Sequence, residues 1–580
     1  MNKKSLLFSA LALFLGVASC TSEESVKDLE GNDLETNFLS VSLVPAPDMT
    51  SRAEGNQTPG DPNNGATYEE GYKSENTVKK VRFYFFDSSG NAAPIKSDNT
   101  NYYDWNAEDN NTQNTPNVEK QLKAIVVINT KDDSGLPDKV VAILNPEVEN
   151  LGAGNLSLSQ LLAKANDYAG TVNGTKPQNF IMTNSVYANG NTEIIATPID
   201  EKNYSSSREG AQQNSLNIYV ERCVAKVRVK LGNNLGYDQT RKRLPLKDDT
   251  GNNIKVGGKD VYLQLGTWNL TADTDRGNLL KDIDPVNWTS DAMGSFYWNW
   301  NPYFRSFWAT NAVGAQQHWY AYNEIAKGGK LFDGTLANSI YANENAPQHA
   351  LTTNAGDYTK VIIAGTLVDS EGKYIEVSKY AGVSYPDKGT LKTAMLNALG
   401  TNTIYSYSTT GNATTFNKLS EDDVEFKTAL DANINGVTAS ESTTGRYNVY
   451  LQLSQIGLAK QWSKSNNSAT LTNDRFENTQ AVNTYLINNL GRAQIYSKGQ
   501  TYYYFPIKHL GDKGKTAEYG VVRNHIYDCT ITALTGLGTP VYDPEQDIYP
   551  EHPVDDETYI AAQINILSWR LVTQDIELNW

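Results

Sequence analysis

The most constraining feature of the chain is a short alternating stretch near its N-terminus. Three apolar residues alternate there with serines, which is the pattern of a half-buried β-strand: Leu39, Val41 and Leu43. Two prolines end the strand, because proline cannot donate a hydrogen bond to a sheet. Arg52, the first arginine of the chain, follows in a polar segment rich in glycine and proline. The stretch predicts a removable strand, with proteolytic cleavage between Arg52 and Ala53; an ordinary N-terminal strand with a chance arginine is the alternative.

The first 20 residues have the composition of an export signal. Two lysines precede a short apolar run, and small residues lead directly to Cys20. The run is too short to span a bilayer comfortably and has the flanks of a signal peptide. Val-Ala-Ser-Cys resembles a bacterial lipobox, so we expect the signal to be removed at Cys20 and the thiol to be acylated, for example with palmitate. Plain secretion with an incidental cysteine is the alternative.

Composition limits the classes of protein that the chain can belong to. At 580 residues it is too long for one hydrophobic core. A net charge of −16 argues against nucleic-acid binding, which needs a basic face. Abundant tyrosine, tryptophan and glycine are typical of an extracellular all-β protein with many turns. Beyond Cys20 only Cys223 and Cys529 remain, which could form one disulfide but not a framework of disulfides.

Alternating and apolar runs predict many strands and few helices. The strands are expected at 78–87, 122–129, 140–144, 180–184, 261–270, 359–368, 374–377, 447–453, 502–507 and 526–533. Short helices are expected at 156–165, 391–399 and 484–490, the last two closed by glycine. A polar stretch, 200–214, separates the first folded region from a long alternating run, Leu216–Leu231, where we place the start of a second domain.

Several motifs occur together in an order that spans nearly the whole chain. They include the lipobox, the strand that precedes Arg52, and five further segments: Val220–Val227, Arg305–Ala309, Tyr341–Asn345, Gly520–Tyr527 and Leu567–Trp569. With these motifs the chain resembles the fimbrillins, the type V pilins of Bacteroidales, and most of all the major subunits of short fimbriae. The resemblance implies an all-β fold of two transthyretin-like β-sandwich domains with short helical insertions.

The resemblance also implies an organisation and a life cycle. The expected parts are a lipoprotein signal peptide (1–20), a propeptide with the removable strand (21–52), an N-terminal sandwich (53–215), a C-terminal sandwich with insertions (216–558) and a donor strand (559–580). The precursor would be lipid-anchored to the outer membrane and cut by an Arg-specific protease. The mature subunit would then polymerise by strand exchange with other copies and with accessory fimbrial subunits. The product is a cell-surface fimbria that supports adhesion to a host or bacterial ligand.

The C-terminus has the composition expected of the donor. Apolar character returns at Tyr559–Trp580 after a spacer, 536–557, that is rich in glycine, proline and acidic residues and is expected to stay extended. The apolar residues that would fill a groove in a neighbour are Ile564, Ile566, Ile576 and Leu578. The alternative is that Tyr559–Trp580 is the last strand of its own sandwich.

The remaining chemical patterns do not indicate catalysis. The five histidines show no metal-ligand spacing, and no nucleotide-binding or hydrolase motif is present, so we expect no enzyme, no catalytic residue, no metal and no cofactor. An aromatic-rich segment, 288–320, could stack on sugars, although packing in a core is the interpretation we favour. A fimbrial tip adhesin or a glycan-binding surface lipoprotein is therefore the alternative function, and a secreted hydrolase ranks far below both.

Overall fold

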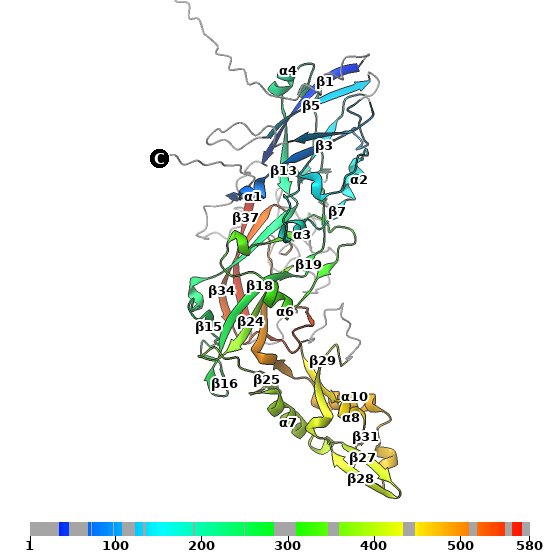
Figure 1. The fold of residues 1–580 in the computed structure, drawn as a ribbon, viewed down its shortest axis with the longest axis vertical. Helices are drawn as coiled ribbons and strands as arrows, with labels where there is room; N and C mark the ends of the chain where they lie inside the picture. Colours follow the sequence, from blue (N-terminus) through cyan, green and yellow to red (C-terminus); the bar gives the residue numbers. More distant parts are fainter. Residues whose placement is uncertain are drawn as a thin grey trace, which may run out of the picture.

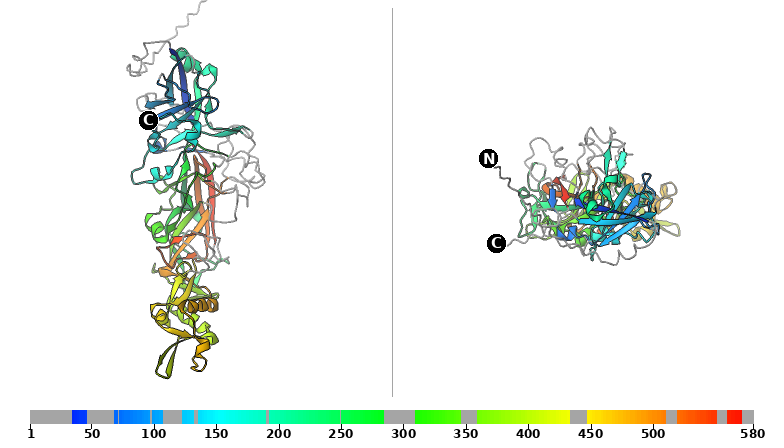
Figure 2. Two further views of the ribbon diagram at one scale, coloured as in Figure 1. Left: turned by 90° about the vertical axis from the view of Figure 1, so that its right-hand side faces the viewer. Right: turned by 90° about the horizontal axis from the view of Figure 1, so that it is seen from above.

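A computed structural model describes residues 34–45, 68–70, 72–96, 98–106, 122–131, 135–189, 192–248, 250–283, 309–345, 359–432, 447–509, 519–550 and 559–570. In these ranges strands predominate over helices, which confirms the prediction of a largely β protein. The number of transthyretin-like domains stays a prediction. The molecule is elongated, with three groups of elements following one another along its long axis (Figures 1 and 2). We call them the first, second and distal modules.

The first module is built on one nine-stranded sheet. Its main path runs in the order β12 (Tyr204–Ser205), β1 (Leu34–Pro45), β13 (Leu216–Arg222), β8 (Met182–Asn184), β6 (Lys139–Leu144), β3 (Lys80–Phe86) and β4 (Tyr102–Asn106). Two strands pair off this path, β5 (Leu122–Lys131) with β1 and β11 (Thr197–Pro198) with β6. The helices are α2 (Leu158–Leu162), α3 (Tyr168–Asn173) and α4 (Arg208–Gln213). Apolar residues of β1, β3, β5, β6 and β13 form one buried core.

The second module is a sandwich of two five-stranded sheets. One sheet runs β2 (Tyr68–Glu70), β37 (Tyr559–Arg570), β34 (His525–Thr535), β14 (Val224–Leu231) and β23 (Ile340–Asn343). The other runs β15 (Arg243–Pro245), β18 (Tyr262–Thr271), β24 (Lys360–Val368), β33 (Gln500–Pro506) and β35 (Thr539–Pro540). Residues of both sheets, including Val229, Ile363 and Tyr503, share a core between them. Burial of this core is the main force that holds the two sheets face to face.

The distal module is inserted through a narrow neck. Strands β25 (Val377–Tyr380) and β32 (Gln494–Tyr496) pair with each other, and β26 (Val383–Tyr385) extends their sheet. Beyond the neck lie α7 (Lys388–Ala398), β27 (Tyr405–Thr410), β28 (Ala413–Lys418), β29 (Val424–Thr428), β30 (Val449–Leu453), α8 (Gln455–Leu458), β31 (Gln461–Ser463), α9 (Leu471–Asp474) and α10 (Thr479–Leu490). They enclose a separate core that contains Leu391, Leu451, Trp462 and Leu486. The module lies at the end of the molecule opposite β1 (Figure 1).

All three predicted helices are present, but their ends differ from the prediction. Helices α7 and α10 begin three and five residues earlier than predicted, whereas α2 is shorter than the predicted 156–165 at both ends. Helix α7 begins where Asp387 accepts a hydrogen bond from the backbone N–H of Thr390 at 2.7 Å, which caps its first turn. Gly400 and Gly491, which follow α7 and α10, have φ values of 52° and 71°, a conformation that favours glycine.

The long run Leu216–Leu231 is not one strand as its alternation predicts. It is divided at Cys223 into β13, which belongs to the first module, and β14, which belongs to the second. The residues that face a core shift from even positions in β13, such as Ile218 and Val220, to odd positions in β14, such as Val227 and Val229. This change of phase marks the point at which the chain changes sheets, and the prediction of a single strand does not account for it. The strand predicted at 374–377 also differs, since Val377 begins a strand that pairs with β32 in the neck.

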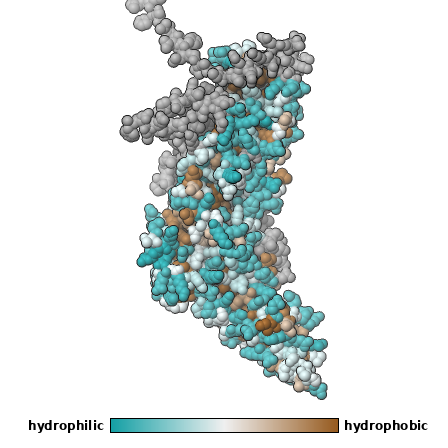
Figure 3. Space-filling view, viewed as in Figure 1, coloured by the Kyte–Doolittle hydropathy of each residue, from teal (hydrophilic) through white to brown (hydrophobic). Residues whose placement is uncertain are grey.

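The face of the molecule in Figure 3 is mainly hydrophilic, and its apolar residues occur in small scattered groups. Scattered apolar residues of this kind are normal on a protein surface. No helix within the described ranges is long and apolar enough to cross a membrane.

Candidate functional site

Strand β1, which contains the predicted removable segment, is an interior strand of the first module. Along Leu34–Leu43 it pairs antiparallel with β5, in register from Lys131 to Leu122. On its other side, Val41–Pro45 pairs in parallel with β13, and an earlier part pairs with β12. The strand therefore lies between β5 and the rest of the sheet (Figure 1).

The apolar side chains predicted for this strand face the core. Leu39 and Val41 are fully buried, and Leu43 is 3% exposed. Leu39 lies opposite Val126 and Val41 lies opposite Ala124, so β1 and β5 contribute to the core together. The prediction that these three residues face inward is confirmed.

The serine face of β1 is also buried, although the alternation predicts that it faces solvent. Ser40 and Ser42 are 1% and 3% exposed. The Ser40 hydroxyl lies 2.7 Å from that of Ser215, which follows α4, and the guanidinium of Arg208 in α4 lies over the Phe38 ring. Helix α4 thus covers this face. A small, hydrogen-bonded serine can be buried at low cost, which is why its polarity is misleading here.

Removal of β1 would change the sheet in a specific way. In the described part of the chain, β5 pairs with no strand except β1. Without β1, the backbone groups of β5 and of β13 that now face it would lose their partners, and the apolar core would open along a strand-shaped groove. Unpaired backbone at a sheet edge readily accepts an added strand.

The predicted processing positions cannot be located in the fold. Cys20, Arg52 and Ala53 lie outside the described residues. The described part of the N-terminal stretch ends at Pro45 and resumes at Tyr68.

The C-terminal strand lies in the sheet of its own chain. β37 pairs antiparallel with β34, with Ile564 opposite Cys529 and Ile566 opposite Tyr527. Ile576 and Leu578 lie outside the described residues. Whether this segment serves as a donor in a polymer stays a prediction.

The described part of the predicted spacer, 536–550, is not extended away from the fold as its composition predicts. β35 pairs with β33, and β36 (Asp547–Ile548) pairs with β22 (Tyr320–Ala321). Val541 and Ile548 are buried in a small core with Ile325 of α6 (Tyr322–Gly328). Gly536 and Gly538 have positive φ values of 73° and 76°, Pro540 lies within β35, and the buried apolar residues hold this part of the chain against the fold.

The aromatic-rich segment lies mostly outside the described residues, and its two described members pack against other parts of the chain. Trp319 stacks on Tyr549 with ring centroids 4.7 Å apart, and Tyr320 packs against the small core around Ile325.

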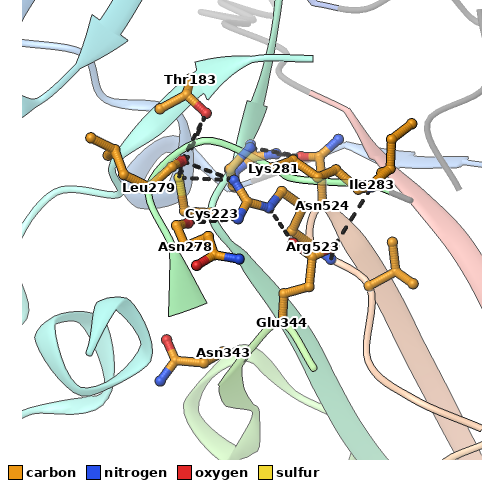
Figure 4. Close-up of polar contacts among 12 residues, drawn as sticks. Thr183, Cys223, Asn278, Leu279, Lys281, Ile283, Asn343, Glu344, Arg523 and Asn524 are labelled. Carbon is orange, nitrogen blue, oxygen red and sulfur yellow. Dashed lines mark hydrogen bonds and ion pairs between the residues drawn. The ribbon is translucent and has the colours of Figure 1, made fainter. Parts of the chain in front are cut away.

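A buried polar cluster joins the first and second modules (Figure 4). Sequence reasoning missed it, because its members are far apart in the chain and only their charges mark them. Arg523, which is fully buried, donates to the Glu344 carboxylate at 2.6 Å and to the backbone carbonyls of Asn278 and Leu279 at 2.6 and 3.1 Å. The Leu279 carbonyl also accepts from Thr183 of the first module at 3.3 Å. The cluster thus combines a cation from the segment before β34, a carboxylate from the segment after β23, backbone carbonyls at 278–279 and a hydroxyl from β8.

Cys223 and Cys529 are free thiols, and both are buried. The disulfide that the sequence left open is therefore not formed in this structure. Burial raises the pKa of the Cys223 thiol to about 11, so this thiol is neutral at physiological pH. Within the described ranges, no group of three or more histidine, cysteine or acidic side chains could hold a metal ion.

Comparison with known proteins gives one family match. Residues 494–575 match the model of the major fimbrial subunit protein type IV, fimbrillin, C-terminal. This segment contains β33, β34 and β37, and the match confirms the fimbrillin resemblance predicted from the sequence. No curated protein matches the chain.

Three solved bacterial proteins resemble this chain at low sequence identity. A fimbrilin from Porphyromonas gingivalis is 13% identical, with 93% of this chain and 98% of that chain covered and a TM-score of 0.35. A candidate cell adhesion protein from Bacteroides eggerthii is 11% identical, with the same coverage and TM-score. Another from Parabacteroides distasonis is 9% identical, covers 92% and 100%, and has a TM-score of 0.34. Scores of this size do not establish a shared fold, so the family match is the comparison that bears on function.

Proposed function

We propose that this chain, which carries the C-terminal segment of the fimbrillin family, is a structural subunit of a cell-surface fimbria. In this proposal the precursor is exported as a lipoprotein acylated at Cys20 and is held at the outer membrane. An Arg-specific protease then cuts between Arg52 and Ala53. The cut releases the lipid anchor and β1 together, and a strand of another subunit fills the site that β1 leaves.

The observation that carries the proposal is the position of β1. Ten residues of β1 pair with β5, and β5 has no other strand partner in the described part of the chain. Loss of β1 would therefore leave a groove with backbone donors and acceptors on both sides and apolar pockets for alternate side chains. A strand of the same length from a second copy would restore the lost hydrogen bonds and the buried apolar area.

The C-terminal segment Tyr559–Trp580 is the donor that we propose. Its alternate apolar residues, Ile564, Ile566, Ile576 and Leu578, would enter the pockets that Leu39, Val41 and Leu43 vacate. Because β37 pairs with β34 in the subunit, donation requires that part or all of this segment leave its own sheet. The fimbria would then serve adhesion, with its ligand on a host or bacterial surface.

Substitution of the cleavage residue tests the proposal. Arg52→Ala should leave the strand attached, so the groove stays filled and cells carry uncut monomer without fibres. The matched control is Thr50→Ala, which alters the same segment but keeps the arginine. Negative-stain microscopy and N-terminal sequencing are the measurements, and the fibres of the control should begin with Ala-Glu-Gly-Asn. Normal fibres assembled from Arg52→Ala protein with the strand still attached would contradict the proposal.

A further inference from the structure

The residues that follow the proposed cleavage position cover the C-terminal strand. β2 runs in parallel along the last described residues of β37, with Tyr68 opposite Ser568 and Glu70 opposite Arg570. On its other side β37 pairs with β34. At Ser568 β37 thus has a strand on each side, and among the described strands Trp569 and Arg570 pair with β2 alone. Because a strand edge with free backbone groups can pair with another chain, β2 occupies an edge that would otherwise be open.

β2 is too short to hold this position by itself. It has 3 residues, and a strand pair of that length has little stability in water. The chain continues directly into α1 (Lys73–Asn76), which lies at the same end of β37 in Figure 1. What fixes α1 therefore decides whether β2 stays in place.

Helix α1 is fixed by a buried carboxylate. Glu75 is 1% exposed and accepts from the Lys226 ammonium at 3.0 Å and from the Tyr341 hydroxyl at 2.6 Å. The same carboxylate accepts from the backbone N–H of Tyr72 at 2.8 Å. Lys226 is fully buried, so its charge has no water to solvate it if Glu75 is lost.

A second buried cation holds the backbone of α1. Arg222, which is fully buried, donates from Nε to the Glu75 carbonyl at 3.1 Å and also donates to the Asn76 side chain. Another of its nitrogens donates to Asn524, which directly precedes β34, at 3.2 Å. The guanidinium therefore joins α1 to the strand that pairs with β37.

The anchor and the covered edge belong to the same sheet. Lys226 lies on β14 and Tyr341 on β23, and the sheet order is β2, β37, β34, β14, β23. Ala225 and Val227 face the core between the two sheets, so Lys226 projects from the opposite face. The N-terminal segment thus pairs with β37 near one edge of the sheet and is anchored on the strands at the other.

We propose that Tyr68–Glu70 together with Tyr72–Asn76 is a latch that holds the C-terminal strand in its own sheet, and that the Glu75 carboxylate is its anchor. The consequence for assembly rests on the proposed function. Residues before Arg52 fill the groove of the first module, and residues after Arg52 restrain the proposed donor. The latch begins at Tyr68, so it remains in the chain after cleavage and must be displaced before β37 can leave.

Amide hydrogen exchange of the full-length cut protein tests the latch without any polymer. Glu75→Gln keeps the shape of the side chain but removes the charge that pairs with Lys226. The amides of Tyr68–Glu70 and of Ser568–Arg570 should then exchange about tenfold faster or more, because the local opening of β2 becomes less costly. If Glu75→Gln does not fold, Tyr341→Phe removes one hydrogen bond to the same carboxylate while keeping its pair with Lys226, and it should accelerate exchange of the same amides by a smaller factor.

The matched control lies on the same sheet but away from the latch. Asp528 is 5% exposed and accepts from Arg228 at 2.7 Å and from Lys230 at 2.9 Å, so Asp528→Asn also removes a buried carboxylate from this face. It should leave exchange at β2 unchanged. Unchanged exchange in Glu75→Gln, or in Tyr341→Phe where it takes the place of that variant, or equal acceleration at both segments in the control, would overturn the latch. Absence of fibres from cells with the natural gene would contradict the proposed function and would not alter this exchange result.

Discussion

At the scale of single residues, the molecule depends on charges that are buried and paired between distant segments. The Glu344 carboxylate accepts from Arg523 and lies 3.6 Å from the Lys281 ammonium, and all three side chains are at most 2% exposed. Burial by itself raises the pKa of Glu344, but the charges of Arg523 and Lys281 outweigh it and lower this pKa below its ordinary value of 4.5. The carboxylate is thus ionised in the folded protein because the two cations are beside it.

This cluster predicts a loss of stability in acid. A carboxyl whose pKa is lower in the folded state binds fewer protons there than in the unfolded state, so its contribution is present above about pH 4.5 and is lost as the pH falls below it. Glu344→Gln should lower the free energy of unfolding at pH 7 by about 3–5 kcal/mol, because it leaves buried cations uncompensated. Urea unfolding at pH 7 and pH 4 measures both effects, and the variant should lose less stability between the two pH values than the natural chain.

A surface pair supplies the control for this prediction. Glu425 lies 3.4 Å from Lys427 and its side chain is 43% exposed, so Glu425→Gln should change the free energy of unfolding by about 1 kcal/mol or less. Equal effects of the two substitutions at pH 7 would show that burial of the Glu344 pair is not what stabilises the junction.

At the scale of elements, β1 is part of the core before cleavage and would be absent after it. Its apolar side chains are packed against β5, and its serine face is covered by α4. The first module of the uncut chain therefore includes a strand that the proposed function removes. The proposed donor β37, in contrast, is held in the sandwich by pairing with β34 and, at its last described residues, with β2.

A core substitution in β1 should affect only the uncut chain. Leu39 is fully buried, and Leu39→Ala should lower the stability of the first module by about 2–5 kcal/mol through lost burial and the cavity that remains. After cleavage at Arg52 the residue is gone, so the cut forms of variant and natural protein should melt at the same temperature. Scanning calorimetry of cut and uncut protein measures this, and a difference that persists after cleavage would mean that β1 stays bound.

At the scale of the whole molecule, the three modules follow one another along one axis (Figure 1). The core of the first module also includes Val224 and Ile526 from strands of the second, whereas the distal module has a core of its own. The distal module is connected through β25 and β32, in which Lys379 lies opposite Gln494. Its core shares no residue with the core of the sandwich. Contacts outside the neck also exist, since the Tyr542 hydroxyl donates to the Phe426 carbonyl at 3.1 Å.

These separate cores predict that the distal module can be removed. Joining Tyr380 to Ala493 through Asn-Gly should close the neck as a hairpin, because that turn matches the twist of two antiparallel strands. The remaining chain should keep the sandwich, and its melting transition should stay within a few degrees of the natural one. Circular dichroism and calorimetry measure this. Loss of the sandwich transition would show that contacts such as Tyr542 with Phe426 are essential to it.

The sequence by itself determined the β class, most strand positions, the helices α7 and α10, the inward side chains of β1 and the fimbrillin resemblance. The class, strands, helices and inward side chains follow from periodicity and turn residues, which a few neighbouring residues express, and the resemblance follows from the order of motifs along the chain. Only the tertiary structure decided that Leu216–Leu231 changes sheets at Cys223 and that the serine face of β1 is covered by α4. It also decided that β37 pairs within its own chain and that Glu75 forms an ion pair with Lys226. Both contacts join residues that are far apart in the sequence, and no local pattern predicts which partner a strand edge or a buried charge will have.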